Sequence, residues 1–256
     1  METIELLAAG LPIRLTLRHS STRRYFRRFL LETSAASRFP SDAWLALPPV
    51  DASALQQEQK RLGFDPAFAE YSLLIEAFGN PVLRFRRFLF HGVAIAWRGK
   101  AWILTGKSGV GKTTQLHHWE ALFGEEYHLI SGDKALIEDR DDGFWVHPSP
   151  WTGKEGEHGS GCAPIGGIVL LEQGKENSIQ RLSPAEAVFP LFLQFLYRPL
   201  ECESVDLVCA YEEQLLRTVP VWKLVNRGDE ASAKLCHDYL LKEDRECATA
   251  SGTASS

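Results

Sequence analysis

Apolar and polar positions along the chain predict an alternation of strands and helices. Residues 11–18 (LPIRLTLR) alternate apolar and polar side chains, which is typical of a half-buried strand. The apolar runs 88–97 (FLFHGVAIAW) and 101–106 (AWILTG), joined by the turn RGK, predict a strand pair. We expect further strands over residues 127–133, 168–174 and 219–227, and a hairpin over residues 134–150.

Helical patterns lie between these strands. They cover the two short segments 54–64 and 66–79, then residues 112–123, 205–217 and 229–241. Ser183-Pro184-Ala185-Glu186 is a capping-box pattern that begins another helix, which Pro190 should kink or split. Residues 18–29 are also compatible with a helix. The glycine-rich stretch 149–167 has almost no apolar periodicity and is predicted to be a long mobile loop that can serve as a lid.

Together these elements predict an α/β fold in which a mixed sheet is flanked by helices. We expect a small N-terminal α/β accessory layer over residues 1–83 and the main core over residues 84–243. Residues 244–256 (DRECATASGTASS) are expected to be a disordered tail, since they are rich in small and polar side chains.

The strongest motif lies between the strand 101–106 and the helix that follows it. Residues 106–114 (GKSGVGKTT) satisfy the pattern G-x-x-x-x-G-K-[ST] of a phosphate-binding P-loop. Glycines let the backbone N–H groups turn toward phosphate, the lysine reaches the β/γ oxygens, and the threonine hydroxyl binds Mg²⁺. We therefore predict an ATP and Mg²⁺ site formed by Gly106, Lys107, Ser108, Gly109, Val110, Gly111, Lys112, Thr113 and Thr114.

A carboxylate at the end of a neighbouring strand commonly completes such a magnesium site or activates the nucleophile. Asp133 follows the first strand after the P-loop helix, and Glu172 ends the run IVLL. Asp133 is the preferred candidate because a right-handed crossover would bring its strand next to the P-loop strand. Capping of a helix or turn is the alternative role for Asp133. For Glu172, a role in the site and a purely structural role both remain open.

Charge and composition narrow the possible partners. Residues 1–100 carry 14 Lys+Arg and 9 Asp+Glu, a net +5, whereas the remainder carries 14 and 24, a net −10. The overall acidic balance argues against nucleic acid as the main ligand, and the arginines of residues 18–29 are interpreted as cover for apolar surface or as a dock for an acidic partner. No apolar run reaches the roughly 18 residues of a membrane span, so we expect a cytoplasmic protein without a membrane contact. Five scattered cysteines without CxxC spacing indicate reduced thiols.

Residues 90–137 resemble the catalytic core of HPr kinase/phosphorylase and of the smaller HPr-kinase-like proteins. The resemblance is carried by the His-Gly pair at residues 91–92, the loop GKSGVGKTT and the run SGDKALI, and it weakens toward residue 240. The segment PWTGKE (150–155) is similar to a branch of kinase-like proteins within that family. The first 80 residues show little of the resemblance.

The resemblance implies roles for individual residues. Asp133 falls on the aspartate that takes the proton from the attacking hydroxyl and also contacts the metal, and His91 on the histidine that orients it. Gly132 stands where the family has a first aspartate, which puts the family's reverse, phosphorylase activity in doubt. We consider further candidates for neutralising the transferred phosphoryl group or completing the site, at Lys107, Lys154, Glu155, Glu172 and Arg198.

The resulting expectation is an ATP- and Mg²⁺-dependent kinase that phosphorylates a hydroxyl of a protein, peptide or small molecule. Asp133, His91 and Lys112 are its predicted catalytic residues, and a homo-oligomer is possible within such a family. One alternative is a nucleotide-binding switch that transfers nothing, which Gly132 favours. Another is an enzyme similar to ATP-dependent phosphoenolpyruvate carboxykinase, which would need a Mn²⁺ site of lysine, histidine and aspartate that the sequence alone does not bring together.

Overall fold

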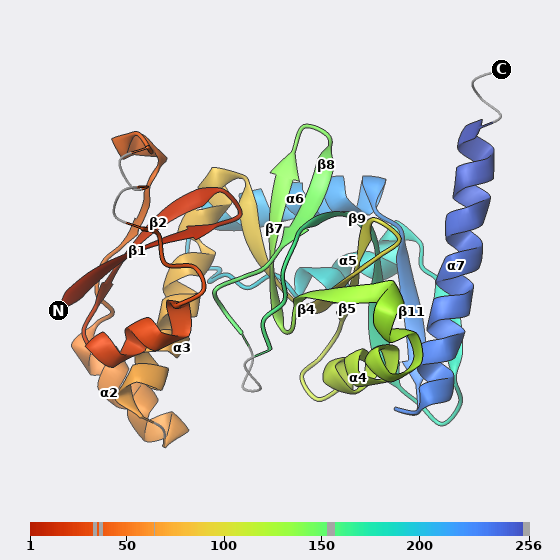
Figure 1. Ribbon diagram of the computed structural model, residues 1–256, viewed down its shortest axis with the longest axis horizontal. Coiled ribbons are helices and arrows are strands. Elements are labelled where there is room, and N and C mark those ends of the chain that lie inside the picture. Colours follow the sequence, from red (N-terminus) through yellow and green to blue (C-terminus); the bar gives the residue numbers. More distant parts are fainter. Residues whose placement is uncertain (33–34, 36–37, 64, 153–156, 253–256) are drawn as a thin grey trace.

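A computed structural model describes residues 1–32, 35, 38–63, 65–152 and 157–252 (Figure 1). Within this part of the chain, three strands form a small sheet and eight form a large one. The small sheet contains β1 (Glu2–Ala8), β2 (Leu11–Leu17) and β3 (Leu45–Leu47). The large sheet contains β4 (Arg87–Trp97), β5 (Lys100–Thr105), β6 (Tyr127–Ser131), β7 (Lys134–Arg140), β8 (Gly143–His147), β9 (Ala163–Gln173), β10 (Ser178–Arg181) and β11 (Val221–Asn226).

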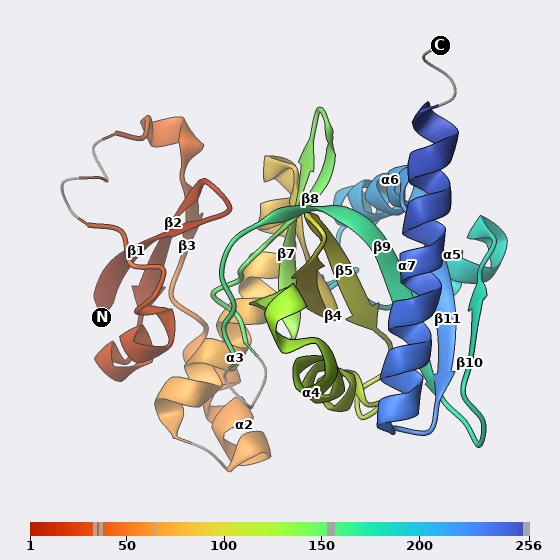
Figure 2. The same ribbon diagram turned by 45° about the vertical axis from the view of Figure 1, so that its right-hand side comes forward.

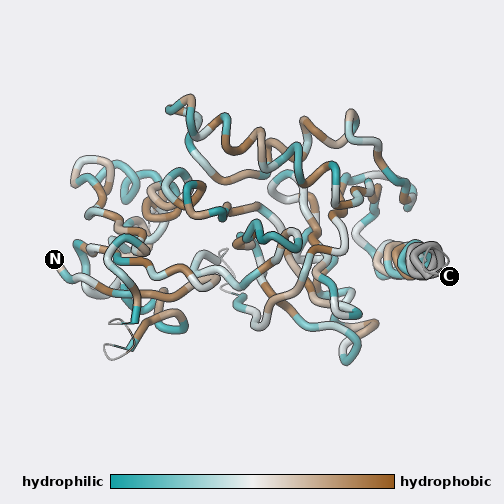
Figure 3. The backbone as a smooth tube through the Cα atoms, turned by 90° about the horizontal axis from the view of Figure 1, so that it is seen from above, coloured by the Kyte–Doolittle hydropathy of each residue, from teal (hydrophilic) through white to brown (hydrophobic). Residues whose placement is uncertain are grey.

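Six α-helices are described: α2 (Ala52–Leu62), α3 (Pro66–Gly79), α4 (Lys112–Phe123), α5 (Pro184–Phe192), α6 (Cys202–Thr218) and α7 (Glu230–Gly252). Short 3₁₀-helices cover Ser20–Phe26, Ser41–Ala43, Pro81–Phe85 and Gly124–Glu126. The N-terminus and α7 lie at opposite ends of the long axis of the molecule (Figure 3). The expected α/β class with a mixed sheet flanked by helices is therefore confirmed.

The large sheet is mixed and runs in the order β10-β11-β9-β5-β4-β7-β8, with β6 also beside β4. Strand β9 is parallel to both β5 and β11, whereas β4 is antiparallel to β5, β6 and β7. The first half of β4 pairs with β7, and its second half pairs with β5 and β6. Because β4 is shared in this way, it brings the start of β7 next to the end of β5.

Helices cover both faces of this sheet. On one face α4 and α7 pack over Val169 and Leu171 of β9, and on the other α5 and α6 pack over Ile168 and Leu170 (Figures 1 and 2). Alternate side chains of a strand point to opposite faces, so a strand covered on both faces needs a continuous apolar run. This explains the sequence IVLL in the middle of β9.

The small sheet packs against α2 and α3 to form the N-terminal layer. Its apolar cluster includes Trp151, which lies between β8 and β9. The ring of Trp151 contacts that of Phe26 edge-on, with centroids 5.0 Å apart. The fully buried Glu70 of α3 accepts hydrogen bonds from the backbone N–H of His19 (3.0 Å) and the hydroxyl of Thr22 (2.6 Å). Buried carboxylates are tolerated when they are hydrogen-bonded in this way, so Glu70 fixes the turn after β2 onto α3.

The predicted loop over residues 149–167 is only partly correct, because β9 already begins at Ala163. Two of the glycines that suggested mobility are packing residues: a Cβ at Gly167 would lie 2.2 Å from the ring of Trp222, and one at Gly166 would lie 2.9 Å from the side chain of Lys100. Glycine here leaves room for the rings of Trp102 and Trp222 to approach the backbone of β9.

Three other expectations differ from the structure. The helix within residues 18–29 is a 3₁₀-helix over Ser20–Phe26, and α5 is not split at Pro190 but continues to Phe192. The backbone of α7 is helical to Gly252, where a disordered tail was expected from residue 244, and residues 253–256 lie outside the described residues. Strands β1, β3 and β10 were not expected, since each is short or depends on pairing with a distant partner.

A buried acid between α5 and α6 predicts a pH-dependent stability. Glu212 is 4 % exposed, and its Oε1 has no hydrogen-bond partner among the described residues. Burial raises the pKa of Glu212 to about 7, although the backbone N–H of Phe192 opposes the change. This pKa lies above the ordinary value of 4.5. The contribution of protonated Glu212 to the stability of the fold is therefore fully present below pH 4.5 and is lost as pH rises through about 7.

We therefore expect Glu212→Gln to change the free energy of unfolding differently at the two ends of this range. At pH 8 the change should be more stabilising than at pH 4 by about 2 to 3 kcal/mol. Urea unfolding at both pH values measures this difference. The matched control is Glu213→Gln, since that neighbouring carboxylate is 63% exposed and pairs with Arg217. Equal effects of the two substitutions at both pH values would contradict the assignment.

Candidate functional site

The glycine loop (residues 106–111) connects the end of β5 to the start of α4, as the motif requires. Gly106, Gly109 and Gly111 have φ values of +140°, +78° and +102°, which side-chain-bearing residues rarely adopt. A Cβ at Gly106 would also lie 2.9 Å from the carbonyl oxygen of Leu171. The glycines are therefore required by the path of the backbone around the N-terminus of α4.

Lys112 is the first residue of α4, and its side chain turns back into the loop. The residue is 8 % exposed, and its ammonium donates to the carbonyl oxygens of Gly106 (3.1 Å) and Lys107 (3.2 Å). Burial lowers the pKa of Lys112, while the nearby carboxylate of Asp133 acts in the opposite direction. The loop thus encloses a positive charge that has no carboxylate in direct contact among the described residues.

Asp133 lies between β6 and β7, beside the middle of β4. Its carbonyl oxygen accepts a hydrogen bond from the backbone N–H of Gly92 (2.7 Å), and its Oδ1 lies 3.4 Å from Nε2 of His91. Its Oδ2 forms an ion pair with Nζ of Lys134. The predicted pair of Asp133 and His91 is therefore brought together, and Lys134 joins it.

The reason given for choosing Asp133 from the sequence was wrong in one respect. Strand β6 does not neighbour the P-loop strand β5, because β4 lies between them, and the parallel neighbour of β5 is β9. Asp133 still lies near the loop because the chain pairs with β4 before and after it. The crossover through α4 skips one strand.

The pKa of Asp133 is about 2. Burial alone would raise this pKa, but the hydrogen bond from His91 and the charge of Lys134 together outweigh burial. The carboxylate is consequently ionised at every physiological pH. Such a group is well suited to bind a cation and is a weak base.

One cavity of about 640 Å³ joins these residues. Part of the glycine loop forms one wall with the start of α4, and His91, Asp133 and Lys134 lie beside them. The loop and helix residues of this wall are Ser108, Gly109, Gly111, Lys112, Thr113 and Thr114, whereas Gly106, Lys107 and Val110 line a different cavity. The opposite wall comes from α2, α3 and the residues around them: Arg61, Leu62, Phe68, Tyr71, Ser72 and Ile75. The N-terminal layer therefore contributes directly to the candidate site.

Sequence reasoning missed that wall and Lys134. Nothing in the sequence relates α3 to the glycine loop, since they meet only through the packing of the N-terminal layer on the core. Lys134 could have been found, because it directly follows Asp133 in the sequence.

A chain of hydrogen bonds ties α3 to Asp133. The backbone N–H of Thr152 donates to the hydroxyl of Tyr71 (2.6 Å), and that hydroxyl donates to the carbonyl oxygen of Pro150 (3.1 Å). The ammonium of Lys134 donates to the carbonyl oxygen of Thr152 (3.3 Å) while it pairs with Asp133. The N-terminal layer and the predicted catalytic carboxylate are thus linked through two backbone groups of Thr152.

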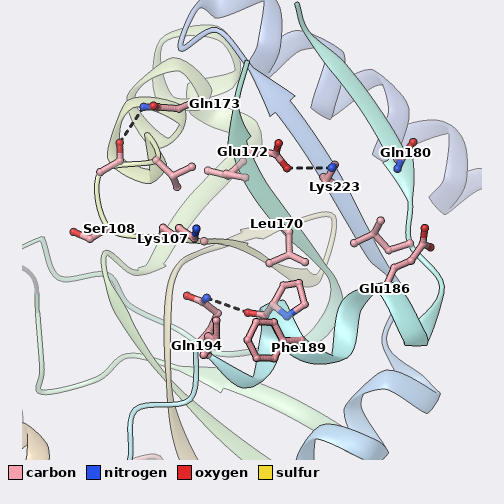
Figure 4. A pocket seen from close by; sticks show the side chains of 17 residues that line it. Lys107, Ser108, Leu170, Glu172, Gln173, Gln180, Glu186, Phe189, Gln194 and Lys223 are labelled. Carbon is pink, nitrogen blue, oxygen red and sulfur yellow. Dashed lines mark hydrogen bonds and ion pairs between the residues drawn. The ribbon is translucent and has the colours of Figure 1, made fainter. Parts of the chain in front are cut away.

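A second cavity, of about 810 Å³, lies against the other side of the glycine loop (Figure 4). Glu172 lines it and pairs with Lys223 (3.0 Å), and Gln173 donates to the carbonyl oxygen of Gly109 (3.1 Å). Lys107 also lines this second cavity and does not line the first. Glu172 is therefore separated from Asp133 by the loop, and the structure does not bring the two carboxylates together.

The remaining candidates lie elsewhere. Arg198 pairs with Glu76, its backbone N–H donates to Asn80 (2.7 Å), and it lines neither cavity. Lys154 and Glu155 lie outside the described residues. No group of three or more His, Cys, Asp and Glu side chains within the described ranges is arranged to hold a metal ion. Thr113 and Asp133 are two of the oxygen-bearing side chains that line the cavity together with Lys112.

Comparison with models of known protein families and with curated proteins finds no match to this chain. None of the helices in the described ranges is long and apolar enough to cross a lipid bilayer.

Proposed function

We propose that this chain is an ATP- and Mg²⁺-dependent kinase that transfers the γ-phosphoryl group to a hydroxyl of a protein, peptide or small molecule. The observation that carries the proposal is the convergence of Lys112, Asp133 and the N-terminus of α4 on one cavity. Phosphoryl transfer needs positioned positive charge for the phosphates and a carboxylate beside the reacting oxygens, with little covalent chemistry from the protein. The resemblance of residues 90–137 to the HPr kinase core leads to the same proposal.

The loop is suited to bind phosphate for three reasons. Its glycines adopt the backbone angles that direct successive N–H groups inward, α4 begins at Lys112 with its positive dipole end toward the loop, and the Lys112 ammonium is already inside. That ammonium now donates to two loop carbonyls. Phosphate oxygens are stronger acceptors than these carbonyls, so Lys112 would exchange its partners on binding.

The donor set also suits Mg²⁺. A hydroxyl from Thr113 and a carboxylate from Asp133, ionised because its pKa is about 2, are hard oxygen donors of the kind that Mg²⁺ prefers together with phosphate and water oxygens. The ion would neutralise charge on the β- and γ-phosphates. Thr113 and Asp133 are therefore the residues that would hold it.

In the proposed reaction the acceptor oxygen forms a bond to the γ-phosphorus as the bond to the β,γ-bridging oxygen breaks. ADP leaves with that electron pair, and the acceptor hydroxyl loses its proton. Asp133 would orient the hydroxyl by accepting its hydrogen bond, with proton transfer late because a carboxylate of pKa about 2 is a weak base. His91 would hold Oδ1 of Asp133 in place.

The experiment is transfer of labelled γ-phosphate from ATP into a lysate of the source cells, heated to inactivate its own kinases. We expect label on a discrete acceptor with the wild-type protein, and none with Lys112→Ala or Asp133→Asn. If ATP binds but neither an acceptor nor water takes the phosphate, the kinase proposal fails. The nucleotide-binding switch then becomes the better description.

The structure weakens one argument for that switch. Gly132 suggested a lost carboxylate, yet a Cβ at this position would lie 2.7 Å from the carbonyl oxygen of Glu157. Glycine is therefore required because the backbone of Glu157 packs against residue 132, next to the β-bridge between Ser131 and His158. Its presence needs no loss of activity to explain it.

A second candidate gains from one observation. The lysine, histidine and aspartate that a phosphoenolpyruvate carboxykinase-like metal site would need do come together here, as Lys134, His91 and Asp133. Incubation with phosphoenolpyruvate, bicarbonate and ADP, followed by assay of oxaloacetate and ATP, separates the two proposals. We expect no product, because Lys134 is ion-paired with Asp133 and is therefore a charged ammonium rather than a neutral metal ligand.

A further inference from the structure

The geometry points to a specific role for Lys134, which rests on the proposed function. We propose that the Lys134 ammonium occupies the cation position on Asp133 in the nucleotide-free protein. A metal–nucleotide complex would displace this ammonium, which then binds the phosphate oxygens. Lys134 would thus be a positioning residue that keeps the site closed to metal alone and adds positive charge once ATP is bound.

Both oxygens of the Asp133 carboxylate already have a partner. Oδ1 faces His91 at 3.4 Å, and Oδ2 is paired with Lys134, whose side chain is only 18 % exposed. A divalent cation that binds this carboxylate must therefore compete with one of the two. The question is which partner moves.

His91 is held more firmly than Lys134. Its backbone N–H donates to the carbonyl oxygen of Gln194 (2.8 Å), and its carbonyl oxygen accepts from the hydroxyl of Thr105 (2.5 Å), so its residue is fixed within β4. The Lys134 side chain has four rotatable bonds and, beyond Asp133, donates to a backbone carbonyl at 3.3 Å. The ammonium of Lys134 is thus the group that can leave at low cost.

The destination of the displaced ammonium is also in place. Lys134 and Lys112 line the same cavity, and the charge of Lys134 is one of the influences that lower the pKa of Lys112. Two ammonium groups that line one cavity repel one another, and an anion between them removes this repulsion. The phosphates of ATP would supply that anion.

The test is Lys134→Gln, which removes the charge and keeps a polar side chain of similar reach. The two binding constants measured are those for Mn²⁺ without nucleotide, by electron paramagnetic resonance, and for ATP without metal, in EDTA by calorimetry. We expect Mn²⁺ to bind about 5-fold more tightly and metal-free ATP about 10-fold more weakly. Opposite signs distinguish this role from a merely structural one, which would weaken both.

Two further variants complete the test. Lys175→Gln removes an exposed charge in the turn between β9 and β10 and should leave both constants unchanged. Lys134→Arg keeps the positive charge and can bind the carboxylate with two N–H groups, so it should weaken Mn²⁺ binding and retain ATP binding. It also keeps the inference testable if Lys134→Gln does not fold.

Weaker Mn²⁺ binding by Lys134→Gln would overturn the inference, because Lys134 would then be a metal ligand or a structural tie. Unchanged constants would overturn it as well. Failure of the proposed function looks different: the wild-type protein would transfer no phosphate from ATP, whereas the test of Lys134 measures binding constants alone.

Discussion

Lys112→Ala is expected to weaken binding of Mg²⁺-ATP by about 100-fold or more, because it removes a buried charge that would face the phosphates in the proposed site. Lys112 is 8 % exposed, and a water molecule that entered the space left by truncation would carry no positive charge. Isothermal titration calorimetry with Mg²⁺-ATP measures the change. Lys175→Ala, which removes an exposed lysine, serves as the matched control.

The fold should survive this substitution. Burial of the ammonium opposes folding, as the lowered pKa of Lys112 indicates, while its two hydrogen bonds to loop carbonyls favour folding. We therefore expect the free energy of unfolding to change by no more than about 1 kcal/mol. A variant that still binds Mg²⁺-ATP with the wild-type affinity would show that the glycine loop is not the phosphate site.

Asp133→Asn should lower the rate of phosphoryl transfer by about 1000-fold while changing ATP affinity by less than about 10-fold. The substitution keeps the shape of the side chain but removes the charge that would hold Mg²⁺ and accept the hydroxyl proton. Single-turnover transfer and calorimetry measure the two quantities separately. Loss of binding without loss of the transfer rate would contradict this role for Asp133.

The effect of Asp133→Asn on folding stability should depend on pH, because the wild-type Asp133 carboxylate titrates. Its pKa of about 2 lies below the ordinary value of 3.8, so the carboxylate stabilises the folded state above pH 4, and this contribution is lost as pH falls toward 2. We expect the stability difference between wild type and Asp133→Asn to be full at pH 7 and to shrink below pH 4. Between pH 5 and 8, titration of Asp133 should not affect the wild-type transfer rate.

Local patterns were sufficient to predict the glycine loop and the elements on either side of it. An apolar strand, glycines that permit positive φ and a helix beginning at Lys112 are all properties of neighbouring residues, and the structure has them at the expected positions. The capping box of α5 was readable for the same reason: Ser183 and Glu186 are three residues apart and bond each other at 2.7 Å. Glycines were ambiguous, however. Gly166 and Gly167 are typical of a loop in the sequence, but in the structure they make room for Trp102 and Trp222 beside strand β9.

The candidate site as a whole depended on contacts between distant segments. The sequence by itself determined the class of fold and the glycine loop between a strand and a helix, since short motifs and periodicity are set by adjacent side chains. His91 and Asp133 became candidates through the resemblance to the HPr kinase core. Only the tertiary structure decided that β4 separates β5 from β6, that Glu172 lies in another cavity and that α3 forms the opposite wall. It also placed the Lys134 ammonium on Asp133. Strand order and the packing of one layer on another arise from burial summed over the whole chain, which no single stretch of residues encodes.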